Sequence, residues 1–183
     1  MSESVPTGPI SIGFLTVFQD GTGYLGGYLV TNSWGRPLEF RLSTAVQPNR
    51  VQSILYGSTL QEYLCADLIG KTLIDKTATP IHLLVTDALN VLPIRTRLDI
   101  PVLAVVPQDD PTLPFLPSER IDRFPQERTA TPLLYDPRQE ADRERIAALL
   151  EKIDPALDLS EPFSRIREAM GEARKLGATS RAA

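Results

Sequence analysis

The chain has 183 residues, of which 42% are hydrophobic and 23% are charged, and its formal net charge is −4. This size and composition are typical of a globular protein that buries a sufficient core without disulfides, and the single cysteine, Cys65, excludes an internal disulfide. The weak negative charge argues against the broad basic surface of proteins that coat nucleic acids. Residues 1–9 lack the features of a signal peptide, and no apolar run is long enough to span a bilayer. We therefore expect a cytoplasmic protein without a membrane contact.

The first 48 residues predict three antiparallel strands. Residues 10–18 are apolar on both faces, with Ile12 and Phe14 on one and Leu15 and Val17 on the other, as in a central strand of a covered sheet. Asp20-Gly21 predicts a hairpin, residues 24–32 the return strand, and Gly26-Gly27 a bulge or a close backbone approach. The third strand, residues 38–46, has the alternation of an edge strand. We expect its apolar residues to face inward and its charged residues outward: Leu38, Phe40 and Leu42 against Glu39 and Arg41.

The hydrophobic period changes after the third strand, and a mixed α/β domain over residues 1–106 results. Residues 49–56 predict a short helix that stops at Gly57, and Ser58 to Gln61 resemble a capping box for a longer helix that reaches about Lys76. Residues 81–86 and 100–106 are apolar strands joined by a short connection, which favours a parallel pair. The predicted fold class is therefore α/β, with three antiparallel strands, a helix and two parallel strands.

The composition changes again at Pro107. Residues 107–135 combine many prolines with recurring apolar side chains, and they predict an extended arm that packs on its own domain or on a partner. Residues 136–183 predict a C-terminal αα-hairpin and tail, because two helical stripes are separated by a short break. The chain thus divides into a core domain, an arm and a helical hairpin.

Three antiparallel strands, a helix and then parallel strands resemble the opening of the RNase H-like superfamily over about residues 10–110. Asp-Gly-Thr at 20–22 and Leu-Leu-Val-Thr-Asp at 83–87 are similar to its first and fourth strands. The resemblance implies that Asp20, Glu62 and Asp87 hold two magnesium ions and catalyse phosphodiester cleavage, with Asp109 or Asp110 as a further ligand. Hard cations of this kind need several carboxylate oxygens that converge at one sheet edge.

Other interpretations of the same residues stay open. A second alignment starts the family's helix at Asn49, places Gln52 where the acid should lie, and implies an inactive site. Asp20 can also be a hairpin residue, Glu62 a first-turn helix acid and Asp87 a strand terminus. The order of elements is similar, too, to longin-like, roadblock-like and profilin-like scaffolds, which bind without catalysis.

The leading functional hypothesis is a non-catalytic interaction or assembly subunit, without a cofactor, that binds a protein partner or a second copy through the arm and the helical hairpin. Its candidate contact residues are Trp34, Phe115, Phe124 and Tyr135. The alternative is an RNase H-like magnesium-dependent nuclease, active or degenerate, with nucleic acid as a partner that the charge does not favour. A third hypothesis is a small-molecule sensor with a pocket between sheet and helix.

Overall fold

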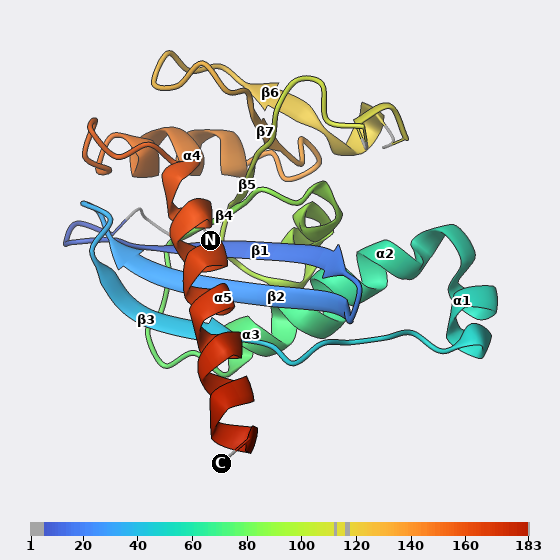
Figure 1. The fold of residues 1–183 in the computed structure, drawn as a ribbon. Helices are drawn as coiled ribbons and strands as arrows, with labels where there is room; N and C mark the ends of the chain where they lie inside the picture. Colours follow the sequence, from blue (N-terminus) through green and yellow to red (C-terminus); the bar gives the residue numbers. More distant parts are fainter. Residues whose placement is uncertain (1–5, 112, 116–117, 183) are drawn as a thin grey trace.

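The computed structural model describes residues 6–111, 113–115 and 118–182. Within these ranges the chain forms one seven-stranded sheet in the order β3-β2-β1-β4-β5-β7-β6 (Figure 1). β1 pairs antiparallel with β2 and parallel with β4, and β4 pairs parallel with β5. The predicted order of three antiparallel and two parallel strands is confirmed. The strands are β1 (Ser11–Asp20), β2 (Gly23–Asn32), β3 (Pro37–Leu42), β4 (Leu83–Thr86), β5 (Val102–Val105), β6 (Asp122–Phe124) and β7 (Leu133–Tyr135).

In the described residues, helical segments lie between β3 and β4, between β4 and β5, between β5 and β6, and after β7. Five are α-helical: α1 (Arg50–Tyr56), α2 (Leu60–Glu62), α3 (Lys71–Asp75), α4 (Asp142–Leu150) and α5 (Glu161–Ala182). The π-helix η2 (Tyr63–Gly70) joins α2 to α3, and the 3₁₀ segments are η1 (Gly57–Thr59), η3 (Leu89–Arg97), η4 (Leu113–Phe115) and η5 (Ser118–Arg120). Among the residues described, no helix has the length and apolar character needed to cross a bilayer.

The start of α1 follows its local sequence, whereas the start of α2 does not. The Asn49 side chain accepts a hydrogen bond from the Gln52 N–H at 2.8 Å, and the Gln52 side chain accepts one from the Asn49 N–H at 3.0 Å. α1 ends at Gly57, as predicted. The capping box predicted at Ser58 is absent, because Thr59 already has helical dihedrals and η1 leads straight into α2 without a side-chain cap.

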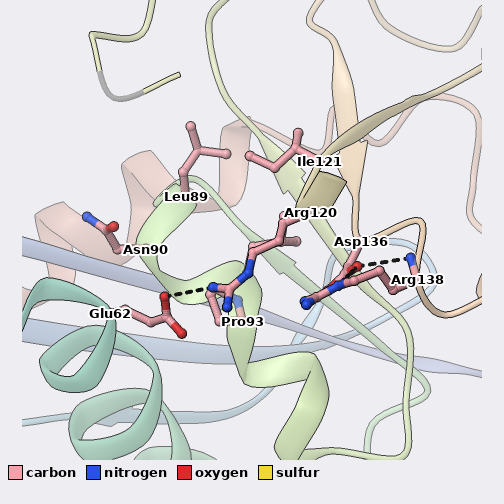
Figure 2. Close-up of a pocket in the computed structure, with 9 residues that line it drawn as sticks. Glu62, Leu89, Asn90, Pro93, Arg120, Ile121, Asp136 and Arg138 are labelled. Carbon is pink, nitrogen blue, oxygen red and sulfur yellow. Dashed lines mark hydrogen bonds and ion pairs between the residues drawn. The ribbon is translucent and has the colours of Figure 1, made fainter. Parts of the chain in front are cut away.

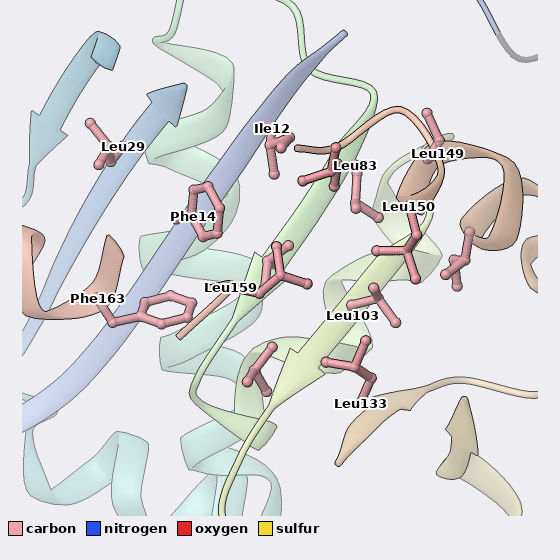
Figure 3. Close-up of a cluster of buried hydrophobic side chains, with 14 of the residues drawn as sticks. Ile12, Phe14, Leu29, Leu83, Leu103, Leu133, Leu149, Leu150, Leu159 and Phe163 are labelled. Atoms are coloured by element: carbon pink, nitrogen blue, oxygen red, sulfur yellow. The ribbon is translucent and has the colours of Figure 1, made fainter. Parts of the chain in front are cut away.

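The two faces of β1 bury separate cores. Ile12 and Phe14 contribute to the core that α4 and α5 cover, and Leu15 and Val17 contribute to the core under η2, α3 and η3. The prediction of a central strand covered on both faces is therefore confirmed. Figure 3 shows the first core, in which strand residues meet residues of and beside the C-terminal helices; those labelled are Ile12, Phe14, Leu29, Leu83, Leu103, Leu133, Leu149, Leu150, Leu159 and Phe163.

Gly26 and Gly27 let two helical elements approach β2 from opposite sides. A Cβ atom at Gly26 would lie 2.3 Å from Ile69 Cγ2 in η2, and one at Gly27 would lie 2.4 Å from Ile166 Cγ2 in α5. Side chains at these positions would push the helices away from the sheet. The predicted close backbone approach is confirmed.

The facing of β3 is the reverse of the prediction. Leu38, Phe40 and Leu42 are exposed, whereas Glu39 and Arg41 are partly buried. The reason is that Glu39 lies over the chain between α3 and β4, where its carboxylate accepts hydrogen bonds from the N–H groups of Ala78 and Thr79. The local alternation identified an edge strand correctly but could not tell which of its faces would be covered.

The C-terminal third also differs from the prediction. Within the segment 107–135, β6 and β7 extend the sheet beyond β5, so part of the predicted arm is a regular element. α4 begins at Asp142 rather than at Asp136, and α4 and α5 both pack their apolar residues on the sheet. Figure 1 shows α5 crossing β1 and β2 while α4 lies near β5 and β7.

Candidate functional site

The carboxylate of Asp20 closes the β1–β2 turn. It accepts hydrogen bonds from the N–H and hydroxyl of Thr22 at 2.7 and 2.6 Å, and from Arg174 Nη1 of α5 at 2.7 Å. The bond from the Thr22 hydroxyl, followed by the bond from Arg174, lowers the pKa of Asp20 to about 2. The carboxylate is therefore ionised over the physiological pH range and already has three donors.

Asp87 follows β4 at the carboxyl end of the strand. Its Oδ2 accepts a charge-assisted hydrogen bond from Arg167 Nη2 of α5, and the same nitrogen lies 3.3 Å from the Thr16 hydroxyl of β1. Thr16 is completely buried. Asp87 Oδ1 is buried as well, and it has no hydrogen-bond partner among the described residues. One arginine thus joins the two strands at the place where the resemblance implies converging acids.

Arg167 and Arg174 act as a pair because they are seven residues apart on α5. Two helical turns separate them, so both lie on one face of the helix and about 10 Å apart along its axis. Asp20 lies at the end of β1, four residues beyond Thr16, which corresponds to about 13 Å of extended strand. The helix therefore brings one guanidinium to each carboxylate and holds the two pairs apart.

Glu62 lies in a different neighbourhood. It pairs with Arg120 Nη1 at 3.2 Å and lines a small pocket of about 20 Å³, partly open to solvent, between α2, η3 and the chain before β6. Figure 2 shows Glu62 and Arg120 joined in this pocket, and Arg138 with its own partner Asp136. The charged residues of the pocket form two ion pairs, Glu62 with Arg120 and Asp136 with Arg138.

The residues present do not fit a two-magnesium site. In the part of the chain that the structure describes, no group of three or more His, Cys, Asp or Glu side chains could hold a metal ion. Asp20, Glu62 and Asp87 each pair with an arginine instead. Asp109 lies in the exposed turn after β5, near Asp110, and Gln52 caps α1, which buries none of its residues. Neither residue supplies the missing ligands.

The single cysteine and the single histidine have structural roles. Burial raises the pKa of the Cys65 thiol to about 12, so the thiol stays protonated at neutral pH. His82 Nδ1 accepts a hydrogen bond from the Ser11 N–H at 3.0 Å and fixes the start of β1. The structure therefore supplies no Cys–His pair for nucleophilic catalysis in the described residues.

The predicted partner contacts divide between surface and core. Trp34, in the β2–β3 turn, is 69% exposed. Phe124 and Tyr135 pack edge to face with ring centroids 6.0 Å apart, and both are buried in the core that α4 and α5 cover. The Phe115 side chain lies outside the described part of the structure. The aromatic residues of β6 and β7 therefore anchor their segment to its own domain.

Two features of the site were missed in the sequence. The first is the pair of α5 arginines, whose spacing of seven was the available signal. The second is the apolar face of α1, where Val51, Ile54 and Leu55 are all exposed. Val51, Ile54 and Leu55 follow the helical i, i+3, i+4 pattern, which predicts a covered stripe; here nothing in the described residues covers it.

No protein-family model matches the sequence, and no curated protein matches it either. Three of the similar solved structures are two endonucleases V and an Argonaute. The endonuclease V of Bacillus subtilis is 11% identical, has a TM-score of 0.47, and the alignment covers 93% of this chain and 83% of that one. A variant of the Ciona intestinalis endonuclease V, in complex with inosine-containing DNA, is 8% identical with a TM-score of 0.45, over 90% of this chain and 87% of that one.

The third structure, the Argonaute of Marinitoga piezophila with a guide RNA, is 10% identical with a TM-score of 0.32, over 79% of this chain and 26% of that one. The order of strands in the sheet itself carries the assignment of the fold. A central β1, antiparallel to β2 and β3 on one side and parallel to β4 and β5 on the other, is the arrangement expected from the resemblance. The sheet of this chain therefore has the strand order of an RNase H-like fold.

Proposed function

We propose that this protein is a degenerate RNase H-like domain that works as a non-catalytic interaction subunit. The observation that carries the proposal is the contact of Arg167 with both Asp87 and Thr16. It lies beside the carboxyl end of β4 and the middle of β1, where the resemblance implies acids and metal ions. At this place the structure has the neutral hydroxyl of Thr16 and the permanently charged guanidinium of Arg167, and Asp87 is the acid that Arg167 contacts.

The electrostatics of this arrangement disfavour magnesium. A guanidinium is charged at every accessible pH, so a divalent ion at Asp87 would have to displace Arg167 or tolerate its repulsion. Mg²⁺ also loses its hydration water reluctantly and needs near-octahedral oxygen ligands. Asp87 alone, beside the uncharged Thr16, offers too few carboxylate oxygens to offset that cost.

The interaction role is supported by the exposed face of α1. The helix projects away from the sheet in Figure 1, and its three apolar residues point to solvent. The stacked rings of Tyr56 and Tyr63, 4.3 Å apart, hold the end of α1 against η2. A short apolar helix face held in this way is suited to a hydrophobic groove of a protein partner.

The interaction role is tested by capture of partners with the full chain. Tagged wild-type protein is compared with the double variant Ile54→Lys/Leu55→Lys and with Leu176→Lys, which changes an exposed leucine on α5. The proposal predicts a protein that wild type and Leu176→Lys retain and the α1 variant loses, with unchanged circular dichroism for all three. Equal capture by wild type and both variants would contradict the use of α1.

A second candidate function is a magnesium-dependent nuclease, and one observation favours it. Asp87 Oδ1 is buried and no described residue donates a hydrogen bond to it, and a buried oxygen of this kind normally has a donor or an ion as its partner. The assay uses single-stranded, duplex and hybrid substrates with Mg²⁺ or Mn²⁺, and compares wild type, Arg167→Ala and Asp87→Asn. Cleavage by wild type that is lost in Asp87→Asn would establish the nuclease; no cleavage by any of the three is what our proposal predicts.

A further inference from the structure

The outer edge of β3 combines an unpaired backbone with an apolar side-chain face. β3 is the first strand of the sheet, so one side of it has no neighbouring strand among the described residues. Leu38, Phe40 and Leu42 are 52%, 37% and 42% exposed on the face that α5 covers further along, over β1 and β2. Long apolar side chains beside open backbone groups make an edge ready to pair with another strand.

The hydrogen-bond pattern shows which residues of β3 can pair outward. The Ser43 N–H donates to the Gly26 carbonyl of β2 at 2.9 Å, and backbone direction alternates along a strand. Arg41 and Glu39 therefore direct their backbone groups to β2, whereas Phe40 directs its N–H and C=O to the open side. An incoming antiparallel strand would exchange both hydrogen bonds with Phe40.

We propose that a second copy of this chain adds to this edge, with β3 antiparallel to β3 and the two-fold axis at Phe40. In this register Phe40 faces Phe40 of the second copy, and Leu38 faces Leu42. Six apolar side chains then form one continuous cluster on the α5 side of a fourteen-stranded sheet, twice the seven strands of one chain. Backbone pairing supplies affinity, and the side chains fix the register.

The charged residues select this register over its neighbours. With the axis at Phe40, Glu39 of each copy lies opposite Arg41 of the other, and two cross-strand ion pairs form. An axis at Glu39 or at Arg41 would instead oppose two like charges. The strand is thus complementary to itself in one antiparallel alignment, which is the property that an isologous interface requires.

The Glu39 carboxylate is already fixed by hydrogen bonds within the single chain. Glu39 accepts hydrogen bonds from the N–H of Ala78 at 3.1 Å and of Thr79 at 2.9 Å, and from Arg41 Nε at 3.0 Å. These contacts fix its carboxylate beside the free edge and lower the ordering cost of a cross-strand pair. A groove of about 460 Å³ lies on this side of β3, between the strand and the helices η2 and α3, with Lys76 at its border.

The inference does not depend on the proposed function, because β3 contributes nothing to the contacts of Asp87. It is tested by sedimentation velocity over a wide concentration range. Wild type is expected to form a reversible dimer. Phe40→Lys and Phe40→Glu each place like charges on the axis and are expected to be monomeric, whereas an equimolar mixture of the two is expected to form a heterodimer. Leu176→Lys, an exposed control on α5, is expected to dimerise like wild type.

Cysteine cross-linking tests the register. Phe40→Cys is expected to form a disulfide-linked dimer under mild oxidation, because residues paired across the axis have Cα atoms about 5.5 Å apart. Leu38→Cys is expected to remain unlinked by itself and to link when mixed with Leu42→Cys. The native thiol of Cys65 is buried and does not compete. The proposal would be overturned by a monomeric wild type, by a dimer that survives Phe40→Lys, or by cross-linking of Leu38→Cys without Leu42→Cys. A monomeric wild type is also the result expected if the strand of a different protein occupies the edge.

Discussion

Arg167 of α5 contacts Asp87 and Thr16, 80 and 151 residues away in the sequence, and so links the end of β4 to the middle of β1. The helix that carries it lies over the sheet because Gly27 of β2 leaves room for Ile166 and Met170. Packing of the apolar side of α5 therefore determines where its arginines reach. The same helix brings Arg174 to Asp20, 2.7 Å away. The packing of α5 on the sheet therefore determines that Asp20 and Asp87 pair with arginines.

Removal of Arg167 should destabilise the fold, because it leaves the partly buried Asp87 with neither oxygen paired. We expect Arg167→Gln to lower the free energy of unfolding by about 1–3 kcal/mol, measured by urea denaturation. Adding Asp87→Asn should recover part of this loss, since the remaining group carries no charge. Lys71→Gln, at the exposed helical pair with Asp75, is the control and should change stability by less than about 0.5 kcal/mol. An Arg167→Gln variant as stable as this control would contradict the coupling.

The contact between Gly27 and α5 should be sensitive to a single methyl group. Gly27→Ala places a Cβ 2.4 Å from Ile166 Cγ2 and 2.5 Å from the Met170 sulfur, and we expect a loss of about 1–3 kcal/mol from overpacking. Thermal unfolding measures it. Gly21→Ala is the matched control, because a Cβ there has no atom within 4 Å. Combining Gly27→Ala with Ile166→Ala should cost less than the sum of the two single changes; strict additivity would argue against a direct clash.

The buried ion pair of Arg95 and Asp142 should hold α4 to η3. Arg95 donates to the two carboxylate oxygens at 2.6 and 2.9 Å, and both side chains are almost fully buried. Arg95→Met leaves the buried carboxylate with only Arg145 Nη1, 3.7 Å away, as a cationic partner, so we expect a loss of up to about 3–5 kcal/mol. Arg95→Met/Asp142→Leu, which removes both charges, should be more stable than Arg95→Met. If the double variant is no more stable than the single one, the pair does not act as a unit.

The contribution of Glu39 to stability should depend on pH in the acid range. Hydrogen bonds from the backbone, that of Thr79 first, lower the pKa of Glu39 from 4.5 to about 2. A group with a lowered pKa in the folded state stabilises above its unfolded pKa and loses that effect as the pH falls through its folded pKa. The stability difference between wild type and Glu39→Gln should therefore be constant above about pH 5.5 and shrink between pH 4.5 and 2. Urea midpoints at pH 7, 4.5 and 2.5 measure it. If the stability difference between wild type and Glu39→Gln stays constant down to pH 2.5, the charge of Glu39 does not stabilise the fold.

The sequence predicted those parts of the fold that depend on local periodicity. The double-faced pattern of β1, with Phe14 and Leu15 on opposite sides, identified a central strand because successive strand residues point to opposite faces. Asn49 and Gly57 bounded α1 for similarly local reasons. These signals need no knowledge of distant residues.

The remainder depended on contacts between distant segments. The alternation of Leu38 and Glu39 carries no information on which face of β3 will be covered, and the cover comes from Ala78 and Thr79, 39 and 40 residues further on. The arginine partners of Asp20 and Asp87 lie 154 and 80 residues away on α5. Whether an acid binds a metal or an arginine is decided by that docking, so the carboxylates could be found in the sequence but their roles could not.

The most direct test of a degenerate site is magnesium binding by calorimetry, with wild type, Asp87→Asn and Arg167→Gln titrated with MgCl₂ and MnCl₂. The account predicts no saturable binding to wild type at millimolar metal, and no difference between wild type and Asp87→Asn. Saturable binding to wild type that disappears in Asp87→Asn would contradict it, because it would mean that the metal displaces Arg167 and that the RNase H-like site is functional.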